Sequence, residues 1–307
     1  MRGTRLIINA DDLGMSRGIT DGILVAHRYG FLTSASLLVN MAASEYAVER
    51  VASAPKLGVG VHLNICQGRP ISPAREVRSL VDACGNFYAA GVMIRKLWAW
   101  RINARELETE FCAQIRWAKN RGLELTHADS HHHMHIYPAA LVPFSRALAA
   151  EGISCARAAR CTQWAADAAL GGPHEGGLLR RLSVQAYRAA VQATFLGGLN
   201  SPGSRVSFLS RERHHAGDLK QAWRSTLERL PSGTFELACH PGLYEDGFSE
   251  TDRICAQREA EFRWLTDPEL RDVVARNEIQ LITYRELCER RAVRHAAAAA
   301  VAQRHPG

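Results

Sequence analysis

The sequence lacks several features that mark whole classes of protein. None of its eight cysteines forms a C-x-x-C pair, which excludes a zinc ribbon and a thioredoxin-like motif. No run approaches the roughly 18 apolar residues of a membrane span, and the apolar stretch before Asp11 is too short for the core of a signal peptide. Sparse cysteines without a pattern are typical of a reducing compartment, so we expect a cytoplasmic protein without a membrane span.

Lysine is also scarce, because it supplies only four of the 38 basic residues. The formal net charge is +7, yet the arginines are scattered along the chain, whereas a nucleic-acid-binding protein usually gathers its charge in a patch or stripe. We therefore expect no nucleic-acid partner. With 47% hydrophobic and 22% charged residues among 307, the chain can bury a sizeable core, which excludes a disordered, collagenous or disulfide-stapled protein.

Short apolar runs alternate with longer helical patterns along the chain. Strands are predicted at residues 5–10, 34–40, 57–62, 124–130, 153–158, 205–209, 234–239 and 279–283. Helices are predicted at residues 19–28, 45–54, 91–101, 104–121, 139–151, 178–195, 218–230, 254–265 and 269–277. Such β-then-α units predict a parallel sheet with helices outside it. We expect a single-domain α/β protein over residues 1–290, an irregular (β/α) barrel of about seven strands. An Ala- and Arg-rich tail, frayed or disordered, follows at residues 291–307.

Polar side chains that can carry chemistry fall at the carboxyl ends of predicted strands. They are the pair Asp11-Asp12 and the histidines His62, His131 and His240. In α/β barrels, side chains at that end of the strands converge on the active site. Unrelated surface residues would not choose one edge of the sheet, so the coincidence predicts a site there.

The motif DSHHHMH at residues 129–135 places four histidines within five residues. In an extended chain, His131, His133 and His135 would share one side. Imidazole nitrogen is the commonest protein ligand for zinc-like ions. The alternative is a histidine-rich loop that binds metal only adventitiously.

Each of the other motifs has an ordinary structural alternative. His62 can be a hydrogen-bonded core residue, the Asp11-Asp12 pair can cap the next helix, and His240 can end its strand without a partner. On one shared edge, however, Asp12 can complete a His-His-Asp triad with His62 and His131, which leaves positions open for water and substrate. His240 there suits a general acid that protonates a leaving group.

These residues also carry a family resemblance. The motifs NADDLG, VGVHLN, THADSHHHMHIYP and ELACHPG occur in the same order in the YdjC/ChbG-like carbohydrate deacetylases, which the sequence resembles from about residue 4 to residue 290. The resemblance implies an irregular (β/α) barrel related to that of NodB-type polysaccharide deacetylases. It also implies the removal of acetyl groups from N-acetylated amino sugars, including chitooligosaccharides, with one divalent metal ion, zinc or magnesium.

Carried over residue by residue, the resemblance implies roles for seven side chains. The implied metal ligands are Asp12, His62 and His131, the implied general base is Asp11, the implied general acid is His240, and His133 and His135 are implied to contact the substrate or support the ligands.

Several alternatives stay open. A related branch of the family acts on N-acetylglucosaminyl hopanoid lipids, and residues 171–204 carry no motif that would choose between substrates. A different barrel metallohydrolase, such as a phosphoesterase, is a second alternative, and a sugar- or nucleic-acid-binding protein without activity is a third. The expected partner is an N-acetylated amino-sugar substrate, and a homodimer is one alternative for the oligomeric state.

Overall fold

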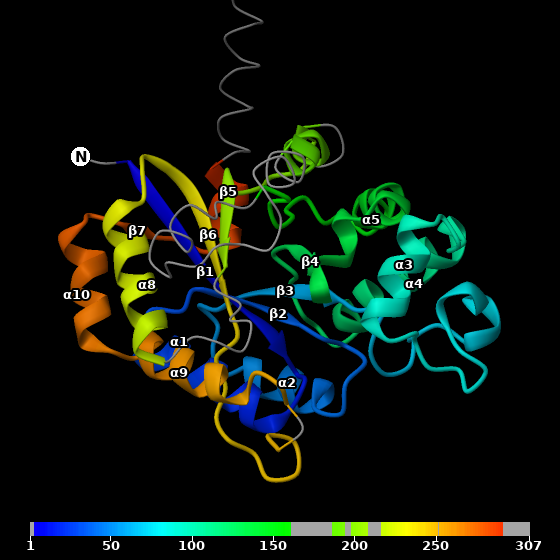
Figure 1. Ribbon diagram of the computed structural model, residues 1–307, viewed down its shortest axis with the longest axis horizontal. Coiled ribbons are helices and arrows are strands. Elements are labelled where there is room, and N and C mark those ends of the chain that lie inside the picture. Colours follow the sequence, from blue (N-terminus) through cyan, green and yellow to red (C-terminus); the bar gives the residue numbers. More distant parts are fainter. Residues whose placement is uncertain (1–2, 161–185, 194–197, 208–215, 251, 291–307) are drawn as a thin grey trace, which may run out of the picture.

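A curled parallel β-sheet lies at the centre of the computed structural model, which describes residues 3–160, 186–193, 198–207, 216–250 and 252–290 (Figure 1). Its seven strands are β1 (Thr4–Leu13), β2 (Ser34–Leu37), β3 (Gly58–Leu63), β4 (Ala128–Ser130), β5 (Ser204–Ser207), β6 (Gly233–Cys239) and β7 (Gln280–Leu281). Their order is β4-β3-β2-β1-β6-β5, with β7 beside the first half of β1. Every pairing is parallel, which confirms the predicted α/β class.

Helices cover the outside of the sheet. They are α1 (Arg17–Tyr29), α2 (Ser44–Val51), α3 (Ala90–Trp98), α4 (Ala104–Lys119), α5 (Pro138–Ala150), α8 (Ala216–Arg229), α9 (Cys255–Leu265) and α10 (Pro268–Arg276). Figure 1 shows α3, α4 and α5 gathered beyond β4, and α8 and α10 on the opposite side of the molecule, near β7. Among the described helices, none has the length and apolar character needed to cross a membrane.

The segment around residues 155 and 156 pairs on both sides and so closes the sheet into an irregular barrel. Ala156 bridges to Ala128 at the end of β4, and its neighbour Cys155 bridges to Asn200. A disulfide ties Cys155 to Cys288, a pairing that the cysteine spacing did not predict. The predicted strand at 153–158 is therefore wrong as a regular strand, because residues 155 and 156 each make one isolated bridge and no run of pairs forms a ladder.

Other predicted boundaries shift by a few residues. Strand β1 runs on to Leu13, so that the Asp11-Asp12 pair lies inside the strand rather than after it. Of the predicted strand 124–130, only the last three residues form β4. The predicted helix 178–195 lies mostly outside the described residues, of which 186–193 are helical. The tail 291–307 lies outside them entirely.

Gly60 in β3 allows a buried aromatic ring to lie directly against the strand. A Cβ atom at residue 60 would lie 2.4 Å from Cε1 of the His127 ring. That ring is fully buried and stacks on Tyr284, with 3.8 Å between the ring centroids. The ring therefore has no free space into which it can move.

We expect Gly60→Ala to lower the free energy of unfolding by about 1–3 kcal/mol, the usual cost of overpacking a core. The matched control is Gly91→Ala in α3, where the nearest atom to an added Cβ is the far end of Arg95 at 3.9 Å. Urea unfolding of both variants measures the difference. A Gly60→Ala chain as stable as the Gly91→Ala chain would contradict this packing.

Candidate active site

The structure brings the five side chains predicted at the strand ends to one edge of the sheet. Asp11 and Asp12 lie near the end of β1, His62 lies in β3, His131 follows β4 and His240 follows β6. Asp12 Oδ1 lies 3.6 Å from His62 Nε2 and 3.0 Å from His131 Nδ1. Asp11 Oδ2 lies 3.8 Å from His240 Nε2. The predicted convergence is therefore observed, and the roles of the residues stay predictions.

Asp12, His62 and His131 form a group whose ligand atoms all lie within 4.8 Å of one another. Asp12 Oδ1 is buried and accepts no well-formed hydrogen bond from the described residues, although two imidazoles face it. A cation between these three atoms would satisfy this oxygen, and one carboxylate with two imidazoles is a donor set of catalytic zinc sites. The residues present thus fit a metal ion.

The second ring nitrogen of His62 supports the interpretation that His62 is a metal ligand. His62 Nδ1 lies 2.7 Å from Asp129 Oδ1, so its proton is assigned to that hydrogen bond and Nε2 faces Asp12. Metal-ligating histidines commonly donate their other N–H to a carboxylate in this way. Burial opposes a charge on the ring, but Asp129, followed by Asp11 and Asp12, raises the pKa of His62 to about 9. Without a cation, the His62 proton therefore supplies positive charge to the site.

A buried arginine that the sequence analysis missed holds Asp11 in place. Arg157, in the closing segment, donates from Nη1 to Asp11 Oδ2 (2.7 Å) and from Nη2 to Asp11 Oδ1 (2.5 Å). It also lies 2.8 Å from a carboxylate oxygen of Asp129 and of Glu236. Burial raises the pKa of Asp11, but the charge and hydrogen bonds of Arg157 outweigh burial and lower it. Asp11 is therefore an ionised carboxylate in a fixed position.

A second unpredicted arginine, Arg258 of α9, holds the other carboxylate. Its Nη2 donates to Asp12 Oδ2 at 2.8 Å, and its Nε donates to Asp252 at 2.6 Å. Despite burial, Arg258, followed by His131, holds the pKa of Asp12 well below its usual range. Asp12 also has a φ of 67°, a left-handed conformation that is rare in a non-glycine residue and often found at functional sites.

Arg258 carried no signal in the sequence, and Arg157 carried only a weak one. Arginine supplies all of the basic residues other than the four lysines, so that one more in a helix or a short apolar run is ordinary. A charged residue within the otherwise small and apolar run around residue 157 was the one available hint.

His240 is held by its backbone rather than by its ring. Its N–H donates to a carboxylate oxygen of Glu261, while its ring Nδ1 is buried without a hydrogen-bond partner among the described residues. Burial lowers the pKa of His240 to about 4, although Asp11 and Asp12 act in the opposite direction. Near neutral pH the ring is therefore uncharged and can take up a proton.

The histidine-rich motif turns instead of running straight. Residues His131–Ile136 form a 3₁₀ turn, in which His132 and His133 have φ angles of 51° and 53°. The expectation that His131, His133 and His135 share one side is therefore wrong, because two successive left-handed residues rotate the chain between them. Of these three, His131 is the one that contacts Asp12 among the described residues.

The two remaining predicted residues lie in different surroundings. The His133 ring contacts the guanidinium of Arg205 in β5, so its predicted contact with the substrate stays a prediction. His135 is only 1% exposed, its ring stacks on Phe144, and its Nδ1 lies 2.6 Å from Ser130 Oγ. This packing favours a structural role for His135 in supporting the turn from inside.

Comparisons with known proteins identify the family. The family model described as YdjC-like protein matches residues 5–276. A carbohydrate deacetylase of Brevibacillus brevis is 33% identical over 291 residues, which cover 92% of this chain and 99% of that protein. A carbohydrate deacetylase of Geobacillus stearothermophilus is 33% identical over 283 residues, covering 91% and 96% of the two chains.

A solved structure extends the agreement to the fold. A protein of Enterococcus faecalis V583, named for cellobiose-phosphate cleavage, superposes with a TM-score of 0.74 at 24% identity, covering 93% of this chain and 99% of that one. At this identity the likeness concerns the fold alone, and it agrees with the predicted irregular barrel. The family predicted from the four motifs is confirmed: the chain belongs to the YdjC-like family.

Proposed function

We propose that this chain is a carbohydrate deacetylase that uses one divalent cation to remove the N-acetyl group of an amino sugar, releasing acetate. The observation that carries the proposal is the different setting of two adjacent carboxylates. Asp12 has one oxygen that accepts no well-formed hydrogen bond and that faces two imidazoles. Asp11, in contrast, is fixed by Arg157 within 3.8 Å of His240. The relatives named carbohydrate deacetylase support the same reaction class.

The cation would be held by Asp12, His62 and His131, and its identity as zinc or magnesium is part of the proposal. When bound there, it would act as a Lewis acid on the acetamide carbonyl and lower the pKa of a water molecule at the site.

The proton steps belong to Asp11 and His240. Asp11 is ionised, so it can accept a proton from the water that attacks the carbonyl carbon. His240 is uncharged at the start and its Nε2 lies 3.8 Å from Asp11 Oδ2, so the proton that Asp11 takes from water can pass through His240 to the amine nitrogen as the C–N bond breaks. The products are acetate and a free amino sugar, which balance the amide and water consumed.

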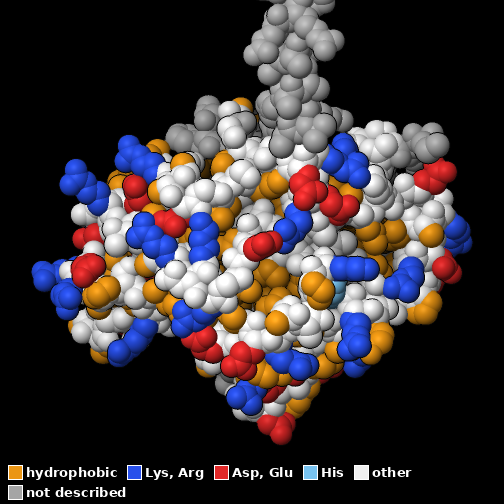
Figure 2. Space-filling view, turned by 180° about the vertical axis from the view of Figure 1, so that it is seen from behind, with side chains coloured by type: hydrophobic (Ala, Val, Ile, Leu, Met, Phe, Trp, Pro, Cys, Tyr) orange, Lys and Arg blue, Asp and Glu red, His pale blue; other side chains and the backbone are white. Residues whose placement is uncertain are grey.

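Two alternatives gain no support from the structure. Asp11, His62 and Asp129 also form a compact group, but Arg157 binds both carboxylates where a second metal of a two-metal phosphoesterase would lie. On the face shown in Figure 2, Lys and Arg side chains are spread among acidic ones without forming one continuous basic patch. The cytoplasmic location, a homodimer and the choice between a free and a lipid-linked sugar stay predictions.

The proposal is tested by acetate release from N-acetylglucosamine oligomers and their conjugates, each with and without a chelator. We expect release that the chelator abolishes and that added zinc or magnesium restores, and none from the matching oligomers without acetyl groups. No release by protein that holds one metal ion per chain would make the substrate class wrong. No release and no metal would refute the proposal.

The variant Asp11→Asn tests whether Asp11 is the general base or a metal ligand. We expect it to retain the metal and to lose about 10²–10⁴-fold in kcat, because the amide cannot accept the proton. Metal content and acetate release are measured together, with Asp272→Asn on the outer helix α10 as a control that keeps both. Loss of metal from Asp11→Asn would instead assign Asp11 as a ligand.

Asp129→Asn tests the support of His62. Because Asp129 fixes the proton on His62 Nδ1, we expect the variant to bind the cation about 10–100-fold more weakly. Competition with a chromophoric chelator gives the affinity, and far-ultraviolet circular dichroism checks the fold. Unchanged metal affinity in a folded variant would show that the Asp129 carboxylate does not support His62 as a ligand.

A further inference from the structure

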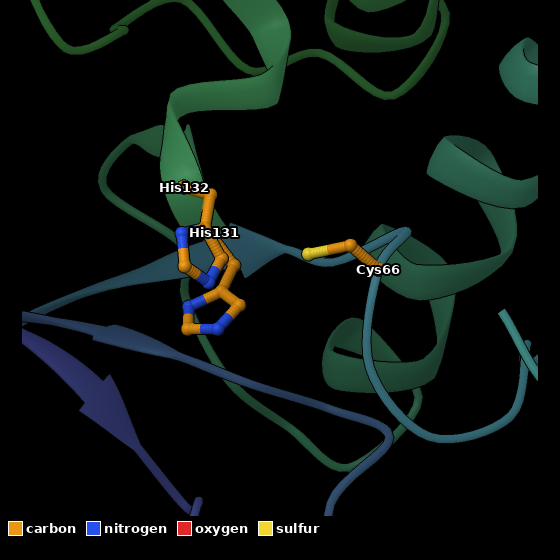
Figure 3. A group of neighbouring side chains, drawn as sticks. All are labelled: Cys66, His131 and His132. Atoms are coloured by element: carbon orange, nitrogen blue, oxygen red, sulfur yellow. The ribbon is translucent and has the colours of Figure 1, made fainter. Parts of the chain in front are cut away.

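A cysteine lies beside the candidate metal group and shares His131 with it. Figure 3 shows the Cys66 side chain, from the loop after β3, extending toward the imidazoles of His131 and His132. Cys66 Sγ and one nitrogen of each ring all lie within 4.8 Å of one another. The two rings are themselves in edge contact, with centroids 4.4 Å apart.

We propose that Cys66, His131 and His132 form a second site, which captures a soft divalent cation such as zinc or cadmium. Because His131 belongs to both groups, capture withdraws it from Asp12 and His62 and inhibits the enzyme. The proposal that a cation binds depends on these three residues alone. Only the proposal that binding inhibits the enzyme rests on the proposed function.

The chemistry of the donors favours a soft cation. One thiolate and two imidazoles suit zinc-like ions, whereas magnesium prefers oxygen ligands. Binding replaces the thiol proton, which leaves to solvent as the metal–sulfur bond forms. Ideal tetrahedral zinc would place these ligand atoms about 3.3–3.6 Å apart, given bonds of about 2.0–2.3 Å. His132 is exposed, so its ring can rotate by the amount required.

The thiol itself is held in a fixed place. Cys66 is 6% exposed, and its backbone N–H donates to Asn64 Oδ1 at 3.0 Å. Asn64 is in turn fixed to α4, since its backbone N–H and carbonyl oxygen both bond to the Gln114 side chain, at 2.9 and 2.6 Å. The Cys66 backbone is thus fixed beside the buried His131, whereas His132 is exposed.

The shared ring makes the two sites compete. His131 Nδ1 lies 3.0 Å from Asp12 Oδ1, so the ring takes part in the first group as the structure stands. A neutral imidazole binds one cation, and two divalent cations on either side of one ring would repel each other strongly. An ion bound to Cys66 and His132 therefore binds His131 as well and removes it from the group that it forms with Asp12 and His62.

The binding part is tested with Cd²⁺ and Co²⁺, whose thiolate complexes have ligand-to-metal charge-transfer bands in the ultraviolet. We expect such a band from the wild-type chain, its loss in Cys66→Ser and its retention in Cys84→Ser, which removes an exposed free cysteine. His132→Asn, an exposed change that does not threaten the fold, should raise the Cd²⁺ concentration needed by about tenfold or more. A wild-type chain without the band, or a band that persists in Cys66→Ser, would overturn the site.

The inhibition is tested by Cd²⁺ titration of magnesium-supported acetate release. Cys66→Ser should require about tenfold or more Cd²⁺ for half inhibition than the wild type and the Cys84→Ser control. Equal sensitivity of all three would refute the inhibitory role. Failure of acetate release itself would count against the proposed function and would leave the charge-transfer result as the separate test of the site.

Discussion

The buried guanidinium of Arg157 is the interaction on which the barrel and its site both depend. It binds Asp11 of β1, Asp129 of β4 and Glu236 of β6, so it joins β4 to the neighbouring strands β1 and β6, from which β4 is separated in the curled sheet by β3 and β2. Its own segment closes the gap between β4 and β5 with isolated bridges instead of a full strand. Without this side chain, buried carboxylates would lose their partner, which typically costs about 3–5 kcal/mol.

The charge balance of this cluster explains why a cation fits beside it. Five carboxyl groups, those of Asp11, Asp12, Asp129, Glu236 and Asp252, meet two guanidinium groups, those of Arg157 and Arg258. Burial raises the pKa of Glu236 despite its contact with Arg157, and this raised pKa relieves part of the excess negative charge. The raised pKa of His62 relieves more of it, because the ring keeps a proton near neutral pH. A divalent cation would replace that proton and balance the remaining carboxylates.

The sequence allowed prediction of those site residues whose position follows from strand geometry. Asp11, Asp12, His62, His131 and His240 end parallel strands, and parallel strands bring their carboxyl ends together whatever their order in the sheet. The same reasoning could not find Arg157 or Arg258, because their partners come from strands and helices far away in the chain. Nothing local distinguishes such an arginine from one at the surface.

The turn at the histidine motif could not be predicted for a different reason. Left-handed conformations at His132 and His133 have no sequence signature, because residues other than glycine adopt them only when the surroundings impose them. The segment at 153–158 has the apolar pattern of a strand. Its bridge partners, however, are Ala128 in the short strand β4 and Asn200, which lies in a part of the sequence that carries no motif. Pattern alone gives the preference of a segment for a strand, and only the available partners decide whether a ladder forms.

Two neighbouring carboxylates can have different functions because their arginines bind them differently. Asp11 accepts hydrogen bonds at both oxygens, two from Arg157 and a third from Asn9, so that each of its oxygens already has a partner. Asp12 is held at one oxygen only, by Arg258, and its other oxygen faces His62 and His131. The left-handed backbone at Asp12 breaks the regular alternation of β1, so that the strand does not fix how the two side chains are directed. The number and direction of the hydrogen bonds to each carboxylate, rather than its residue type, therefore underlie the different roles proposed for Asp11 and Asp12.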